Sequence, residues 1–131
     1  MKNPIKKEVL LILEDYDAIR NVLGRYFDNS GYDVISTGSL ENALRLGKEE
    51  HPEIIVFDSH MHIEDQYKAV TLLHIAMPDC AIVVMNGEDE KERDKMLRLG
   101  VQAVFKRSYD RADFEKAISS IKELHHSSIA A

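Results

Sequence analysis

Short apolar runs alternate along this chain with longer segments in which apolar residues recur every three or four positions. The runs have the length of buried strands, and the periodic segments have the length of helices. The predicted strands are Val9–Leu13, Tyr32–Ser36, Glu53–Asp58, Cys80–Met85 and Val101–Phe105. The predicted helices are Ala18–Phe27, Leu40–Glu50, Gln66–Ala76, Glu88–Leu99 and a last helix that starts at Ser108 or Asp110. This alternation predicts a doubly wound α/β domain, in which a five-stranded parallel sheet carries helices on both faces.

Several residues mark the predicted helix ends. Ser39 suits the start of the second helix because its hydroxyl can accept a hydrogen bond from a free backbone N–H. Pro78 stops the third helix, and Gly100 is a natural residue just beyond the end of the fourth. The apolar face predicted for the first helix consists of Ile19, Val22, Leu23 and Tyr26.

Charged residues follow three of the predicted strands. Glu14 and Asp15 come after the first strand, Asp58 closes the third, and Lys106-Arg107 follows the last. Parallel sheets bind ligands outside the carboxyl ends of their strands, so we expect these carboxylates and a cation to meet at one edge. Clustered acids repel one another, which predicts a metal cation between them. A simpler reading remains for each group: the acid pair as a helix cap, Asp58 as a turn residue, and Lys106-Arg107 as a solvated strand end.

Composition narrows the class of protein. The 131 residues suit one domain, expected at 1–125 with a short polar tail at 126–131. No apolar stretch approaches the ~20 residues of a membrane span, so we expect no membrane segment. The short apolar run Val9–Leu13 leads into acidic residues rather than a cleavage site, so we do not expect export. The lone cysteine, Cys80, fits a buried thiol in a reducing cytoplasm. The net charge of -6 argues against nucleic-acid binding by this domain, because that binding needs lysine and arginine to neutralise phosphates.

The order of these motifs resembles the receiver domain of two-component response regulators over almost the whole chain. The resemblance is carried by the acid pair Glu14-Asp15, by Asp58 at the end of the third strand, and by Gly100 before a strand that ends at Lys106. Each motif alone is weak, but their combined spacing is fairly specific. The resemblance implies a flavodoxin-like fold and a role in phosphorelay signal transduction.

Carried over residue by residue, the resemblance makes Asp58 the phosphoacceptor, and it makes Glu14, Asp15 and Asp58 ligands of Mg²⁺. His60 would add its backbone carbonyl to the metal site, and Lys106 would pair with the phosphoryl oxygens as a mobile point charge. The phosphoryl group would come from a histidine kinase, a phosphotransfer protein or a small phosphodonor. The fourth helix, fifth strand and fifth helix would then present a surface to a downstream protein partner or a second copy of the chain.

Three departures from the family pattern bear on this reading. Asn86 stands where a threonine or serine usually closes the fourth strand, so an amide replaces the hydroxyl near the phosphoryl group. The usual lysine-proline pair is Lys106-Arg107, and one alignment places Arg107 at the lysine position. The aromatic residue typical of the middle of the fifth strand has no clear match among Ala103, Val104 and Phe105.

Other functions stay open at this point. The departures favour, as an alternative, a receiver-like interaction module that does not undergo phosphoryl transfer. His60 and His62 could also be transition-metal ligands, although loop histidines are usually solvated. A small flavodoxin-like enzyme would need a glycine-rich phosphate loop after the first strand, and the acidic run Glu14 to Asp17 is the opposite of one.

Overall fold

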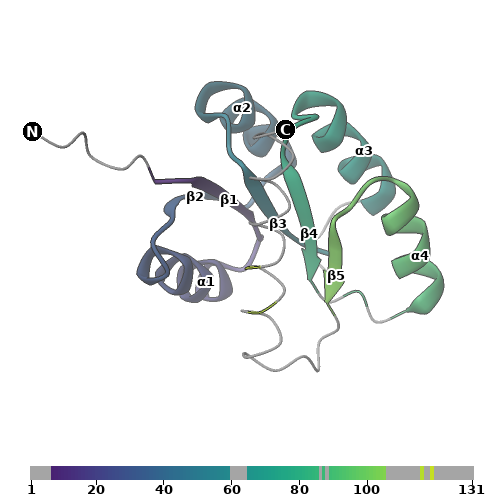
Figure 1. The fold of residues 1–131 in the computed structure, drawn as a ribbon, viewed down its shortest axis with the longest axis horizontal. Coiled ribbons are helices and arrows are strands. Elements are labelled where there is room, and N and C mark those ends of the chain that lie inside the picture. The colour runs from purple at the N-terminus through teal and green to yellow at the C-terminus, as the bar shows by residue number, and fades with distance from the viewer. Residues whose placement is uncertain are drawn as a thin grey trace, which may run out of the picture.

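The computed structural model describes residues 7–59, 65–85, 87, 89–105, 116 and 119 of the chain. These residues contain a parallel five-stranded sheet in the order β2-β1-β3-β4-β5. The strands are β1 (Val9–Leu13), β2 (Asp33–Thr37), β3 (Ile54–Asp58), β4 (Ala81–Met85) and β5 (Ala103–Phe105). Strand β2 lies on one side of β1, and the later strands lie on the other side. Because right-handed connections in these two directions run over opposite faces, the helices cover both faces of the sheet. The predicted doubly wound class is therefore confirmed (Figure 1).

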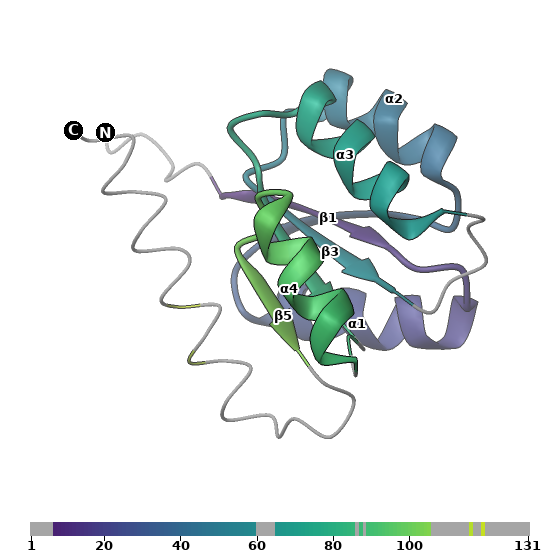
Figure 2. The ribbon, with the colours of Figure 1, turned by 90° about the vertical axis from the view of Figure 1, so that its right-hand side faces the viewer.

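Four helices cover this sheet within the described residues. They are α1 (Asp17–Asn29), α2 (Leu40–Glu50), α3 (Gln66–Ala76) and α4 (Glu90–Arg98). Helix α1 packs on one face, while α2, α3 and α4 pack on the other (Figures 1 and 2). The predicted fifth helix falls almost entirely outside the described residues. None of the helices in the described part of the chain is long and apolar enough to cross a membrane.

The central strands are buried along their whole length. Every residue of β1, β3 and β4 is buried, which explains why these strands appear in the sequence as continuous apolar runs. Alternate residues of each strand point to opposite faces and form two cores. Leu11 and Ile55 pack beneath α2 and α3, whereas Ile12 and Val56 pack against the face covered by α1.

Local signals at the helix ends agree with the sequence. The Ser39 hydroxyl accepts a hydrogen bond from the Asn42 backbone N–H at 3.1 Å, so it caps α2 as predicted. Gly100 has a φ of +100°, a left-handed conformation that favours glycine just after α4. Cys80 is buried, as expected for a thiol that packs as a small hydrophobe.

The predicted apolar face of α1 is partly wrong. Ile19 and Val22 are 47% and 64% exposed, whereas Phe27, just past the predicted stripe, is 1% exposed. Leu23, Tyr26 and Phe27 make the contact with the sheet. The helix is therefore rotated relative to the prediction, so that the Phe27 ring is buried against the sheet and Ile19 and Val22 face outward.

Candidate functional site

The sheet register brings Glu14 and Asp58 together. Leu13 at the end of β1 pairs with Phe57 in β3, so the acids that follow them lie at the same carboxyl edge. Both are buried, with exposed fractions of 1% for Glu14 and 6% for Asp58. The Glu14 backbone N–H donates to the Thr37 carbonyl oxygen at 3.1 Å, which continues the pairing with β2 and fixes the residue in place.

The carboxyl groups of Glu14 and Asp58 are hydrogen-bonded to each other. The pKa of Glu14 is raised to about 8, first because burial disfavours its charged form and then because of the hydrogen bond to Asp58. The negative charges of Asp58 and Asp15 raise it further, while the Tyr16 backbone N–H, which donates to Glu14 Oε1 at 3.0 Å, acts in the opposite direction. The pair therefore holds a proton near neutral pH.

This donor set fits Mg²⁺ better than a transition metal. In the part of the chain that the structure describes, no three or more His, Cys, Asp and Glu side chains form a cluster that could hold a metal ion. Mg²⁺ does not need such a cluster, because it is commonly bound by one or two carboxylates and keeps several waters. The two buried carboxyl groups in contact are oxygen ligands of the kind that Mg²⁺ takes, and the charge of Asp15 raises the pKa of Glu14.

The loop after β1 is not a standard acidic helix cap. The residue before α1 is Tyr16, and its side chain makes no capping hydrogen bond. The Glu14 carboxyl group accepts from the Tyr16 backbone N–H and also contacts Asp58, so it joins the loop to β3. The simple reading of Glu14 and Asp15 as a helix cap therefore accounts for only part of what they do.

Four residues of the predicted site lie outside the described residues: His60, Asn86, Lys106 and Arg107. The strand ends that precede Asn86 and Lys106 are described. Met85 pairs with Asp58 on one side and with Phe105 on the other. The edge that carries Glu14 and Asp58 thus continues across β4 and β5, and the roles of these four residues stay predictions.

Arg20 belongs to this region, and the sequence reading did not single it out. Its guanidinium Nη1 donates to the carbonyl oxygen of Glu14 at 2.7 Å, and its other terminal nitrogen pairs with Asp17. In the sequence, an arginine in the second turn of a helix looks like an ordinary solvated residue. An arginine placed to reach back toward an acid pair is the signal that could have identified it.

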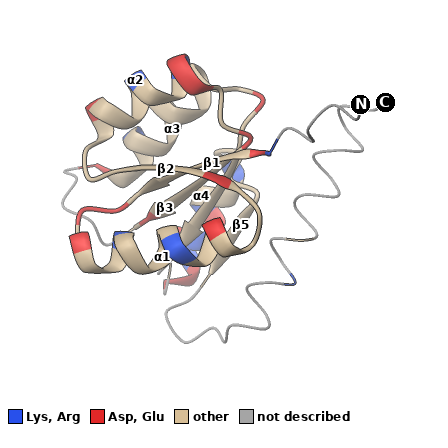
Figure 3. Ribbon diagram, turned by 90° about the vertical axis from the view of Figure 1, so that its left-hand side faces the viewer, with Lys and Arg blue, Asp and Glu red and all other residues tan. Residues whose placement is uncertain are grey.

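Acidic residues are concentrated where α1 begins. Glu14, Asp15 and Asp17 lie within four consecutive positions. Figure 3 shows acidic segments at this corner of the molecule, with a basic segment on α1 beside them. Acidic residues therefore outnumber basic ones at the start of α1, a distribution that favours a cation over an anion.

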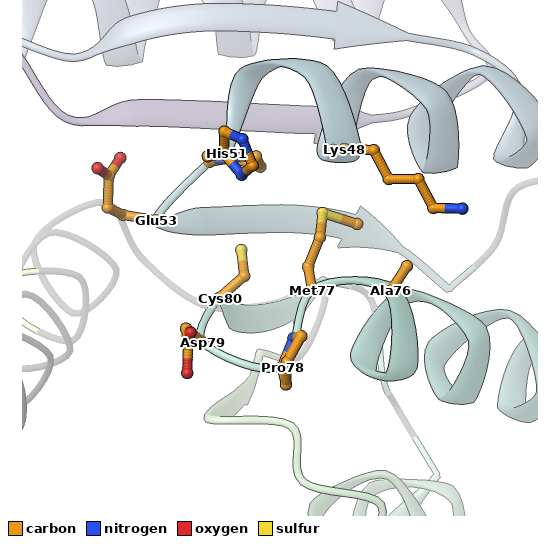
Figure 4. Close-up of a pocket in the computed structure, with 10 residues that line it drawn as sticks. Lys48, His51, Glu53, Ala76, Met77, Pro78, Asp79 and Cys80 are labelled. Carbon is orange, nitrogen blue, oxygen red and sulfur yellow. The ribbon is translucent and has the colours of Figure 1, made fainter.

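A cavity of about 350 Å³ lies at the other end of the strands. Its walls come from the end of α2 and from the segments that lead into β3 and β4, and they include His51, Glu53, Met77 and Cys80 (Figure 4). None of the residues predicted for the metal and phosphoryl site lines this cavity. It is therefore separate from the acidic edge.

Comparisons with known proteins agree on one kind of domain. The family model for the response regulator receiver domain matches residues 10–119. A probable transcriptional regulator, ycf27, from Porphyridium aerugineum is 30% identical over 118 residues, which cover 89% of this chain and 49% of that protein. The chain thus spans about half the length of this curated relative.

Solved structures share the fold at low sequence identity. Chemotaxis protein CheY4 from Vibrio cholerae superposes with a TM-score of 0.79 at 13% identity, covering 88% of this chain and 99% of that one. A response regulator from Burkholderia pseudomallei, solved with a phosphorylated aspartic acid, a calcium ion and citrate, superposes with a TM-score of 0.77 at 19% identity. That match covers 93% of this chain and 73% of that one. At these identities the structures establish the shared fold.

Proposed function

The chain belongs to the family of response regulator receiver domains, which act in two-component systems, and from that membership we propose that Asp58 is its phosphoacceptor. The observation that carries the proposal is the buried contact between Glu14 and Asp58. Burying two acids in contact costs stability, and strongly perturbed ionisable groups of this kind are concentrated at functional sites. We propose that these two acids bind a divalent cation and that Asp58 accepts an incoming phosphoryl group.

The position of Asp58 supports its proposed role as the nucleophile. Its backbone ends β3, its side chain lies at the edge where ligands of parallel sheets bind, and its carboxyl group is an oxygen nucleophile suitable for phosphorus. In the proposed step, an Asp58 oxygen forms a bond to phosphorus while the bond from phosphorus to the donor's histidine nitrogen or acyl oxygen breaks. The departing group keeps the electron pair of that bond. The product is an aspartyl phosphate.

The neighbouring residues are proposed to bind the metal ion and to contact the phosphoryl oxygens during this step. Glu14 and Asp15, together with Asp58 and the His60 carbonyl, are the proposed ligands of Mg²⁺, which when bound would offset the negative charge of the carboxylates and phosphoryl oxygens. Lys106 is the proposed partner of the phosphoryl oxygens, and Asn86 the proposed amide donor near them. For the last two assignments, the support is their sequence position after β5 and β4.

The proposed partners follow from family membership. A histidine kinase or phosphotransfer protein would donate the phosphoryl group in the cytoplasm. Helix α4, strand β5 and the segment that follows would carry the output to a downstream protein or to a second copy of the chain. We assign this activity to a domain that spans residues 1–125, with 126–131 as a polar tail.

Intact-mass spectrometry tests the proposal. The wild-type chain is incubated with acetyl phosphate, with and without Mg²⁺, beside Asp58→Asn and the control Asp79→Asn. Asp79 is an exposed aspartate at the opposite end of the strands, so its substitution removes the same charge away from the site. We expect one Mg²⁺-dependent phosphoryl group on the wild type and on Asp79→Asn, and none on Asp58→Asn. An unmodified wild type would instead favour a receiver-like interaction module.

A further inference from the structure

The side chain of Arg20 reaches from α1 back to the loop that carries the acid pair. Its Nη1 lies 2.7 Å from the carbonyl oxygen of Glu14. The exposed fraction of the Arg20 side chain is 20%, compared with 83% for Asp17, its ion-pair partner. An exposed pair of this kind contributes little stability, so the hydrogen bond to Glu14 is the more significant contact.

Gly38, in the loop between β2 and α2, leaves the space that the Arg20 guanidinium occupies. A Cβ atom at Gly38 would lie 2.9 Å from Arg20 Nη1 and 3.5 Å from both the Glu14 carbonyl oxygen and Asp15 Cα. The φ of Gly38 is not in the positive range, which among the described glycines is found at Gly31 and Gly100. Space rather than backbone conformation therefore calls for glycine at this position.

We propose that Arg20 is a positioning residue for the acid pair Glu14-Asp15. The absence of a side chain at Gly38 leaves a slot that the Arg20 guanidinium group occupies. The carbonyl of Glu14 and the N–H of Asp15 belong to one planar peptide group, so a hydrogen bond to that carbonyl fixes the plane from which the Asp15 side chain departs. Arg20 thereby sets the direction of the Asp15 carboxyl group. We do not assign Arg20 as a ligand of the cation or as a partner of the phosphoryl group.

This inference rests on the proposed function, and it names a residue that the proposed metal site depends on. A carboxylate held in advance at the correct angle loses less conformational freedom when a cation binds. Residues that orient metal ligands affect metal affinity by about 10-fold or more when they are replaced. Loss of the Arg20 hydrogen bond is therefore expected to weaken Mg²⁺ binding while the bound state still reacts.

Two independent substitutions disturb the same contact. Arg20→Ala removes the donor, while Gly38→Ala keeps the arginine and displaces its flexible end from the slot. Arg20→Lys retains one possible donor to the Glu14 carbonyl oxygen. The matched controls are Arg25→Ala, an exposed arginine of the same helix, and Gly24→Ala, where an added Cβ meets no atom within 4 Å.

The experiment is a Mg²⁺ titration followed by backbone amide NMR shifts, together with the phosphorylation rate from acetyl phosphate at saturating Mg²⁺. We expect Arg20→Ala and Gly38→Ala each to raise the half-saturating Mg²⁺ concentration about 10-fold, with a much smaller change in the saturated rate. Arg20→Lys should recover part of the loss. The double variant, with Arg20→Ala and Gly38→Ala, should bind Mg²⁺ no more weakly than the single variant with the lower affinity, because both substitutions disrupt the same contact.

Half-saturation in Arg20→Ala equal to that in Arg25→Ala would overturn the inference. If the wild type itself binds no Mg²⁺, the proposed function fails and the inference is then judged on the metal-free spectra. In those spectra Arg20→Ala and Gly38→Ala should both shift the amide resonances of Asp15 and Tyr16 more than the two controls do. Unchanged resonances would refute the positioning role on their own.

Discussion

Glu14 and Asp58 lie side by side at the ends of neighbouring strands, and their carboxyl groups share a hydrogen bond with almost no exposure to solvent. Two ionised carboxylates in such a place would repel each other strongly, so one proton is retained. In the proposed metal site, a bound divalent cation would take the place of this proton. This relationship links the stability of the metal-free domain to pH and to Mg²⁺.

The metal-free domain should lose stability as the pH rises from about 4.5 to about 8. Glu14 has a pKa raised from 4.5 to about 8 in the folded chain. Across this interval the unfolded chain releases the proton while the folded chain retains it, so the free energy of unfolding falls with rising pH. Each unit of pKa difference corresponds to about 1.4 kcal/mol, which places the total on the order of a few kcal/mol.

Urea unfolding at several pH values in the presence of a chelator measures this effect. Glu14→Gln carries no titrating group at that position and should show a much flatter profile. Added Mg²⁺ should stabilise the wild type most at high pH, because the cation favours the ionised pair. A wild-type profile as flat as that of Glu14→Gln would contradict the assigned cause.

Much of the fold could be predicted from the apolar pattern. Three strands, β1, β3 and β4, are buried on both faces and therefore appear as unbroken apolar runs. The contact between Glu14 and Asp58 was also predictable, because strand ends in a parallel sheet share an edge. For residues in or just after a buried strand, the sequence therefore indicates their place in the sheet.

Other features depend on how the elements pack, which the apolar pattern alone does not determine. Val22 and Leu23 lie three and four positions after Ile19, yet Ile19 and Val22 are exposed while Phe27 is buried against the sheet. Arg20 contacts Glu14 only after the chain has turned from β1 into α1. A side chain as long as that of arginine can contact any of several nearby residues, and the tertiary structure determines which contact forms.

Packing between α2 and the end of α3 predicts a substitution whose effect changes sign. A Cβ at Gly47 would lie 2.1 Å from Sδ of the buried Met77, so Gly47→Ala should destabilise the wild type by about 1 kcal/mol. In a Met77→Ala background the clash is absent. There the same change should stabilise by up to about 1 kcal/mol, because alanine favours the helix.

Urea denaturation of the four proteins in this cycle yields the coupling between the two positions. The cycle consists of the wild type, the two single variants and the double variant. An effect of Gly47→Ala with the same sign and size in both backgrounds would show that Met77 does not limit the space at Gly47.

Helices α3 and α4 are joined by a cation–π contact. Lys95 Nζ lies 3.9 Å from the centroid of the Tyr67 ring. We expect Lys95→Gln to lower the free energy of unfolding by about 0.5–1 kcal/mol, the usual value of such a contact near the surface. Lys91→Gln, an exposed lysine of the same helix, is the control. Equal stabilities of the two variants would mean that the Tyr67 contact adds nothing.

The most direct test of the account is chemical trapping of the proposed aspartyl phosphate. Reduction of the phosphorylated chain with borohydride converts an aspartyl phosphate to homoserine, and peptide mass spectrometry then locates the changed residue. We expect homoserine at position 58, dependent on both phosphodonor and Mg²⁺. Homoserine at another aspartate, or at none after treatment under conditions that phosphorylate a known receiver, would contradict it.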